Sequence, residues 1–190
     1  MTHPLRLAGL VLSLSGVLAV GAAQGAVTVF GGPGPAEDCY KAAKFGIQGG
    51  HKAGIEVCTS AIQTQVMTDH DMAGTYVNRG VIFMAMAQFA PAQHDFESAM
   101  KLAPKMGEAV VNHGGALIAL KHYADGIAEI SRGLELNPSE PEKAYFNRGL
   151  AYESLDDLKA AYYDYSKAAE LKPGWDEPKA ELSRFTVTQR

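Results

Sequence analysis

One short pattern returns three times along the chain, at spacings of 34 and 35 residues. Each copy places an asparagine two residues before a glycine, and these glycines are Gly80, Gly114 and Gly149. After each glycine follow a small residue, a large apolar residue, a second small residue and a closing proline; the prolines are Pro104, Pro138 and Pro173. Self-similarity at this period is the signature of stacked supersecondary units, each of which buries its apolar face against the next. The period therefore predicts a repeat architecture.

The spacing of apolar residues is helical from Glu37 onward. We expect helices at about 37–47, 51–66, 72–87, 90–103, 106–120, 123–136, 141–154, 157–171 and 175–186. A glycine in mid-helix costs about 1 kcal/mol relative to alanine. Small residues on the partner helix, namely Ala92, Gly126 and Ala161, would let the two axes approach closely and offset that cost. The sequence thus predicts an all-α fold of antiparallel helix pairs.

Two helix starts carry recognisable signals. Ser139, with Glu142 three residues later, is typical of a capping box. Asp157 follows Asp156 and puts an acid at the positive end of the last repeat helix. We therefore expect helices to begin near both positions.

The N-terminal segment resembles a secretory signal peptide. Arg6 precedes 17 residues without a charge, and small residues follow near Gly25. A membrane anchor is the alternative, but the run is shorter than the roughly 20 residues that span a bilayer. We expect cleavage near residue 25, no stable membrane span afterwards, and export, with the periplasm of a Gram-negative bacterium as the expected location.

The two cysteines, Cys39 and Cys58, lie 19 positions apart in the first helix pair. In an exported chain such a pair indicates one disulfide. Two buried free thiols are the alternative. A redox-active pair is less favoured, because the spacing is not Cys-x-x-Cys.

Composition and motifs disfavour several function classes. The formal net charge is −4 and no basic block stands out, which argues against nucleic-acid binding. The acids and histidines are densest at Asp69-His70-Asp71, but no metal-ligand motif is present and a solvated turn explains the cluster better. Arg79 and Arg148 are expected to form local ion pairs, and His113 occupies the equivalent position in the middle copy. We predict no enzyme activity, no cofactor and no metal.

The three copies resemble the tetratricopeptide repeat family, and the last, Ala144 to Pro173, is close to a consensus repeat. The resemblance implies a right-handed superhelix, an α-solenoid, whose first helices line a concave groove. The expected organisation is a signal peptide (1–25), a flexible leader (26–36), a degenerate helix pair (37–68), three repeats (73–106, 107–140 and 142–175) and a C-terminal capping helix and tail (176–190).

Family members usually hold a peptide or a partner's helix in that groove. Here the groove would carry a ladder of Asn78, Asn112 and Asn147. Side-chain amides can donate to and accept from an extended peptide backbone, although such asparagines also bond within their own repeat. The flanking apolar positions are Val77, Val81, Val111, Phe146 and Leu150. Because these positions are not basic, the carboxylate-tail recognition of chaperone-binding members is not expected.

The sequence therefore predicts a non-catalytic adaptor of the cell envelope that binds an unidentified protein or peptide in the groove. The alternative is a self-associating structural protein without a peptide ligand, suggested by the aromatic pair Tyr162-Tyr163 and by Trp175. A homo-oligomer would fit that alternative.

Overall fold

The computed structural model describes residues 6–7, 25–28, 34–185 and 187–188 of the 190-residue chain. The helices of this part are α1 (Pro35–Phe45), α2 (Gly50–Thr64), α3 (Asp69–Ala85), α4 (Phe89–Leu102), α5 (Gly107–Ala119), α6 (Tyr123–Glu135), α7 (Pro141–Ser154), α8 (Leu158–Leu171) and α9 (Asp176–Leu182). A two-residue strand β1 (Arg6–Leu7) pairs antiparallel with β2 (Val187–Thr188), with Arg6 opposite Thr188. Most of the predicted signal peptide lies outside the described residues. The all-α solenoid predicted from the period is confirmed.

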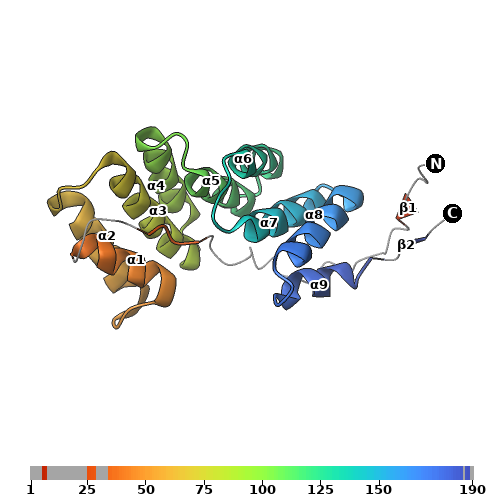
Figure 1. Cartoon of the computed structure of the whole chain (residues 1–190), viewed down its shortest axis with the longest axis horizontal. Coiled ribbons are helices and arrows are strands. Elements are labelled where there is room, and N and C mark those ends of the chain that lie inside the picture. The colour runs from red at the N-terminus through yellow and green to blue at the C-terminus, as the bar shows by residue number, and fades with distance from the viewer. Residues whose placement is uncertain (1–5, 8–24, 29–33, 186, 189–190) are drawn as a thin grey trace.

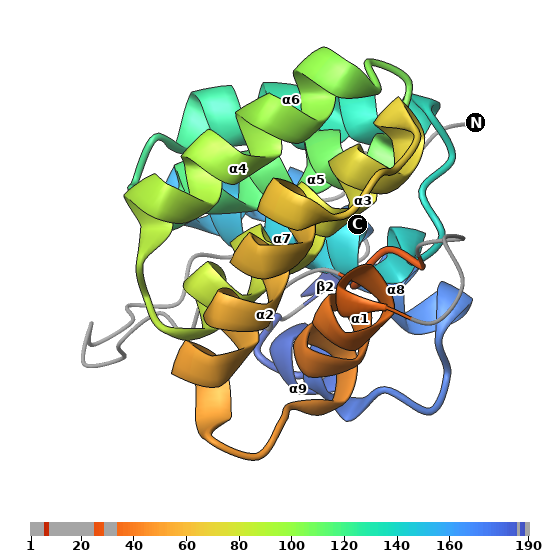
Figure 2. The same ribbon diagram turned by 90° about the vertical axis from the view of Figure 1, so that its left-hand side faces the viewer.

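The helices follow one another as stacked pairs along the long axis of the molecule (Figure 1). Each pair packs on itself and on the next pair, in the order α1/α2, α3/α4, α5/α6 and α7/α8, and α9 covers the end of α8. Seen from the end of the stack that carries α1 and α2, these two helices face the viewer and the later pairs lie behind them (Figure 2). Such a stack makes contacts almost entirely between neighbours in sequence.

The first helices of successive pairs form one continuous wall. Helix α1 contacts α3, α3 contacts α5, and α5 contacts α7. Because these helices lie close enough to touch across repeats, their side of the stack is the shorter one, and the stack curves toward it. We call the surface formed by α1, α3, α5 and α7 the inner wall.

The mid-helix glycines allow close packing in two different ways. In the middle repeat Gly114 faces Gly126, and a Cβ built on Gly114 would lie 2.9 Å from the Gly126 carbonyl oxygen. In the last repeat the same position, Gly149, faces a ring, and its Cβ would lie 2.7 Å from Cε1 of Tyr165. Gly80 likewise faces the Phe96 ring. The expected meeting of two small residues thus holds for the middle pair, whereas the other two glycines make room for an aromatic side chain.

The turn between the two helices of each repeat contains a residue in the left-handed backbone conformation. Ala87, Lys121 and Asp156, which follow α3, α5 and α7, have positive φ angles of 55°, 66° and 61°. A residue in the left-handed region after a helix reverses the chain and satisfies the last carbonyls. The turn therefore recurs at the repeat period although it uses no glycine.

Helix caps differ partly from expectation. Asp157 accepts a hydrogen bond from the Ala160 amide at 3.0 Å, which confirms its role at the start of α8. The capping box expected at Ser139 is wrong. The residue before α7 is Glu140, it makes no side-chain cap, and Glu142 instead pairs at 3.2 Å with Lys172, the residue that follows α8. Proline at the first position of α7 already needs no amide partner, so the cap is dispensable there.

A side-chain N-cap is present at α3. Thr68 Oγ1 accepts from the Asp71 amide at 3.1 Å and donates to the Asp71 carboxylate at 2.8 Å. The Asp69-His70-Asp71 cluster is consequently the first turn of a helix, and α3 begins three residues earlier than expected.

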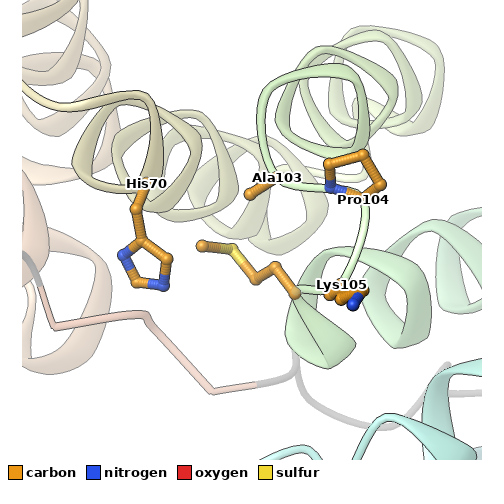
Figure 3. A pocket seen from close by; sticks show the side chains of 5 residues that line it. His70, Ala103, Pro104 and Lys105 are labelled. Carbon is orange, nitrogen blue, oxygen red and sulfur yellow. The ribbon is translucent and has the colours of Figure 1, made fainter.

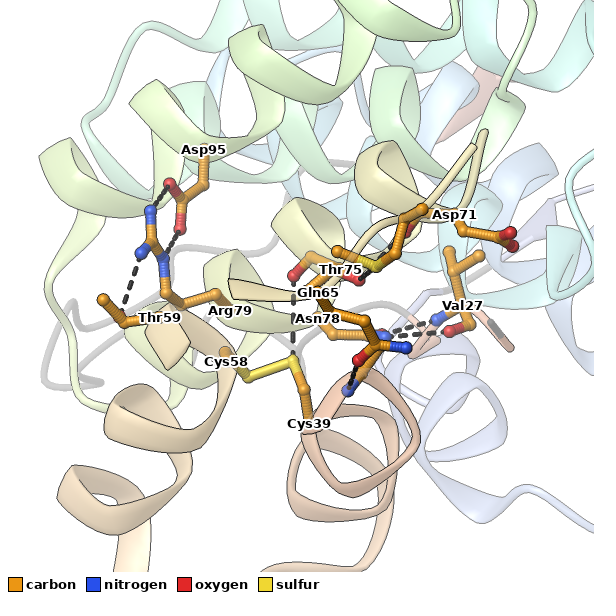
Figure 4. Close-up of a disulfide and its surroundings, with 12 residues drawn as sticks. Val27, Cys39, Cys58, Thr59, Gln65, Asp71, Thr75, Asn78, Arg79 and Asp95 are labelled. Atoms are coloured by element: carbon orange, nitrogen blue, oxygen red, sulfur yellow. Dashed lines mark hydrogen bonds and ion pairs between the residues drawn. A yellow bond between two sulfur atoms is a disulfide. The ribbon is translucent and has the colours of Figure 1, made fainter. Parts of the chain in front are cut away.

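The predicted disulfide joins Cys39 of α1 to Cys58 of α2, with the two Cα atoms 4.6 Å apart (Figure 4). Both cysteines are fully buried. The bridge joins the two helices of the first pair, where Gly54 of α2 also packs closely against Ala42 of α1.

Most aromatic side chains near the C-terminus pack against one another and are at least partly buried. Trp175 lies on the Phe146 ring, with centroids 4.9 Å apart, and Tyr162 contacts Phe185. Tyr163 is half exposed. The expectation that Tyr162 and Trp175 offer free aromatic surface is therefore not met, because these rings pack against other aromatic side chains of the C-terminal region.

Candidate functional site

The three ladder asparagines recur at one position of the inner wall. Asn78 lies on α3, Asn112 on α5 and Asn147 on α7, and their exposed fractions are 0%, 2% and 3%. A buried amide requires partners, because leaving its polar atoms without them costs free energy. The partner of each amide consequently shows what the position does.

Asn78 binds backbone from a distant part of the chain. Its Oδ1 accepts from the Val27 amide at 2.7 Å, and its Nδ2 donates to the Val27 carbonyl at 2.8 Å (Figure 4). Both backbone groups of one residue are satisfied by one side chain, which is the two-point contact that an extended peptide offers. The two residues are 51 positions apart in sequence.

Asn112 and Asn147 have no comparable partner. Nδ2 of Asn112 is buried without a hydrogen-bond partner, and no side-chain bond of Asn147 is found within the described part of the chain. The Asn147 Nδ2 atom lies 3.9 Å from the place where a side chain on Gly115 would begin. These two amides therefore keep hydrogen-bonding capacity that the repeats do not use.

The apolar residues beside the ladder lie mainly in the core. Val77, Val81 and Val111 are exposed by 5% or less, and Phe146 by 6%. Phe146 packs against Tyr165 at a centroid distance of 5.6 Å, while Leu150 is partly buried. Their side chains hold the helices together in this structure, and contact with a ligand stays a prediction for them.

Ion pairs lock the two helices of the first and last repeats. Arg79 donates two hydrogen bonds to the Asp95 carboxylate, at 2.8 and 2.7 Å, and Arg148 donates two to the Asp164 carboxylate, at 2.7 and 2.8 Å. Both aspartates are buried. Hydrogen bonding to the carboxylate raises the pKa of each arginine, against the opposing effect of burial. The local ion pairs expected for these arginines are confirmed.

In the middle repeat a histidine and a glutamate take the places of the arginine and the aspartate. The ring nitrogens of His113 lie 3.7 Å from carboxylate oxygens of Glu97 and Glu129, too far for a hydrogen bond. Glu129 follows His113 by the same 16 positions that separate Arg79 from Asp95. The shorter imidazole leaves a polar gap where the other repeats have a bidentate pair.

A shallow open pocket lies beside the start of α3 (Figure 3). It has a volume of about 390 Å³ and is lined by His70, Ala103, Pro104, Lys105 and Met106. Sequence reasoning missed it, because it forms between the first turn of one helix and the turn between α4 and α5. Its lining is mostly apolar, so it suits a small apolar side chain.

Within the residues that the structure describes, no group of three or more histidine, cysteine, aspartate or glutamate side chains is arranged to hold a metal ion. None of the helices described there is both long and apolar enough to cross a membrane.

Comparison with known proteins identifies the repeat unit. The model of the family described as tetratricopeptide repeat matches residues 73–106 and 142–174. These two segments correspond to the pairs α3/α4 and α7/α8. Both segments are similar to tetratricopeptide repeats.

A longer relative matches more than half of the chain. The chain is 30% identical over 112 residues to the Hsp70-Hsp90 organizing protein of Triticum aestivum, which covers 59% of this chain and 19% of the relative. The chain thus spans less than a fifth of that relative's length.

Solved tetratricopeptide structures have the same architecture. The first repeat domain of Spaghetti (RPAP3), bound to the HSP90 peptide SRMEEVD, is 26% identical, covers 61% of this chain and 94% of its own, and has a TM-score of 0.57. The protein TTC0263 of Thermus thermophilus is 15% identical with a TM-score of 0.66, covering 79% of this chain and 80% of its own. The latter likeness concerns the fold alone.

Proposed function

We propose that this chain is a non-catalytic protein-interaction module whose inner wall binds an extended protein segment. The observation that carries the proposal is the two-point contact of Asn78 with the Val27 backbone. It is an example, within the chain itself, of main-chain recognition by a ladder amide. The same side chain recurs at Asn112 and Asn147, where the capacity is unused.

Relatives support a peptide ligand of this general kind. The Spaghetti (RPAP3) domain was solved with an HSP90 peptide, and the second domain of human RPAP3 with the HSP70 peptide SGPTIEEVD. Both peptides are acidic and end in aspartate. The flanking ladder positions Val77, Val81, Val111, Phe146 and Leu150 carry no charge, so we propose an apolar segment recognised along its backbone rather than an acidic tail.

Export to the cell envelope is part of the proposal. A disulfide in a chain of this size fits an oxidising compartment, and the N-terminal sequence has the three-part pattern of a signal peptide. Fractionation of the native cells and sequencing of the mature N-terminus test this point. A chain that stays in the cytosol with residues 1–25 attached would contradict it.

Capture of partners tests the binding function. The double variant Asn112→Ala/Asn147→Ala should lose crosslinked partners from an envelope extract. Gln63→Ala is the matched control, because it removes an exposed amide from α2, outside the inner wall. Equal capture by both variants would exclude the ladder as the binding site.

Stability provides an independent check of the role of Asn112. Truncation of an asparagine that is bonded within the repeat would lower the free energy of unfolding by about 1–3 kcal/mol, because its hydrogen-bond partners would be left unsatisfied. Asn112 Nδ2 has no partner to lose. The Asn112→Ala variant should therefore unfold at nearly the same denaturant concentration as the native chain while binding partners less well.

A further inference from the structure

Residues 25–28 of the chain lie along the inner wall. Figure 1 shows this short segment crossing the stack beside α1 and α3. Three of its residues approach three different helix pairs of the stack. The segment therefore occupies the surface where a partner peptide is proposed to bind.

Its central residue is held through the main chain. Val27 exchanges both of its backbone hydrogen bonds with Asn78, at 2.7 and 2.8 Å. Its side chain packs against the buried cluster that includes Val77, Val81 and Met106. An extended backbone on the amide and an apolar side chain against the core are the two elements expected of a bound peptide.

The flanking residues fix the direction of the segment. On one side, hydrogen bonds with Lys44 and Thr28 lower the pKa of Tyr40 on α1. On the other side, Gly25 lies directly against the carboxylate of Glu140, the residue before α7, so that a side chain at position 25 would collide with it. In the direction of the chain, the segment thus runs across the wall from the start of α7 past α3 to α1.

We propose that residues 25–28 act as a built-in occupant of the groove, and that a partner segment binds by displacing them and taking their hydrogen bonds to Asn78. This inference rests on the proposed binding function. It adds the register of the ligand: an extended segment with a free backbone amide and carbonyl at an apolar residue, which would take the place of Val27 on Asn78. Removal of residues 1–25 would leave both backbone groups of Val27 in place.

An internal occupant weakens every competitor. A tethered segment has an effective concentration in the millimolar range for a short flexible connection. The measured dissociation constant of an added peptide rises in inverse proportion to the fraction of chains with a free groove. Release of the segment should consequently tighten binding of an added peptide by about tenfold or more.

Two variants at one position release or retain the segment. Val27→Pro removes the amide hydrogen that Asn78 Oδ1 accepts, since proline has none. Val27→Ala keeps both backbone groups and loses only side-chain atoms, so it is the matched control. In the full chain, the NMR signals of the Asn78 side-chain amide should move in Val27→Pro and stay near their native position in Val27→Ala.

The second measurement uses a defined probe. A labelled peptide with the sequence of residues 25–30, capped at both ends, is titrated into each chain. Val27→Pro should bind it at least about tenfold more tightly than the native chain, and Asn78→Ala added to Val27→Pro should abolish binding. Circular dichroism checks that all variants remain folded.

Equal affinity of the native and Val27→Pro chains, or no binding to either, would overturn the inference. So would an unchanged Asn78 amide signal in Val27→Pro. These outcomes leave the binding function standing if partners are still captured through Asn112 and Asn147. Loss of that capture, with the peptide and NMR results as expected, would instead refute the function and keep the occupant.

Discussion

Two neighbouring glycines of α5 should respond oppositely to the same substitution. A Cβ on Gly114 would lie 2.9 Å from the Gly126 carbonyl oxygen and 3.0 Å from the Ile130 amide nitrogen. These are backbone atoms that cannot rotate away, so the helices must separate. A Cβ on Gly115 would find its nearest neighbour, Nδ2 of Asn147, at 3.9 Å, an ordinary contact.

The magnitudes follow from two opposing effects. Alanine in place of glycine favours a helix interior by about 1 kcal/mol at either position. Overpacking costs about 1–3 kcal/mol in addition at Gly114 alone. We expect Gly115→Ala to raise the free energy of unfolding by about 1 kcal/mol, and Gly114→Ala to lower it by up to about 2 kcal/mol.

Urea denaturation followed by circular dichroism measures both variants under the same conditions. The difference between them, about 1–3 kcal/mol, corresponds to roughly 2–12 °C in Tm for a chain of this size. Because both variants add the same methyl group to the same helix, propensity cancels in the comparison. If Gly114→Ala proves as stable as Gly115→Ala, the close crossing of α5 and α6 is wrong.

Three further predictions concern stability. Burial raises the pKa of Tyr165, so its contribution to the free energy of unfolding is complete below the ordinary tyrosine pKa of about 10 and is lost as the pH rises above that value. The free energy of unfolding of Tyr165→Phe should therefore decline less between about pH 9 and 11 than that of the native chain. Equal declines in the two chains would contradict this. His113→Arg should restore the missing bidentate pair with Glu129 and raise the free energy of unfolding by about 1 kcal/mol, whereas a lower value would mean that the site has no room for a guanidinium. Lys121→Gly should stabilise the chain by up to about 1 kcal/mol, because it relieves a left-handed non-glycine residue; a thermal scan that shows no gain would argue against that turn.

Much of the architecture could be predicted because it is periodic. The recurrence of asparagine, glycine and proline indicated paired helices, and a pair of cysteines in one helix pair indicated the disulfide. The ion pair between Arg148 and Asp164 follows the same logic, since both residues recur in the first repeat. Helix pairs and ion pairs recur because each depends on residues within one repeat, and those residues recur with the period.

Helix starts were less predictable. Thr68 caps α3 and Ser139 does not cap α7, although both precede an acid by three residues. The difference arises from Pro141, which begins α7 without needing an amide partner. A capping pattern in the sequence shows only that a suitable side chain is present. The conformation of the surrounding backbone decides whether that side chain caps the helix.

The sequence by itself determined the repeat unit, its helix pairs and the positions of the ladder amides, because each depends on residues within one period. Only the tertiary structure decided that Gly114 meets Gly126 while Gly149 meets a ring, and that Asn78 holds Val27. The last contact joins residues 51 positions apart that share no pattern. It forms because the curved wall leaves a buried amide in need of a partner, and the backbone of the N-terminal segment lies within its reach.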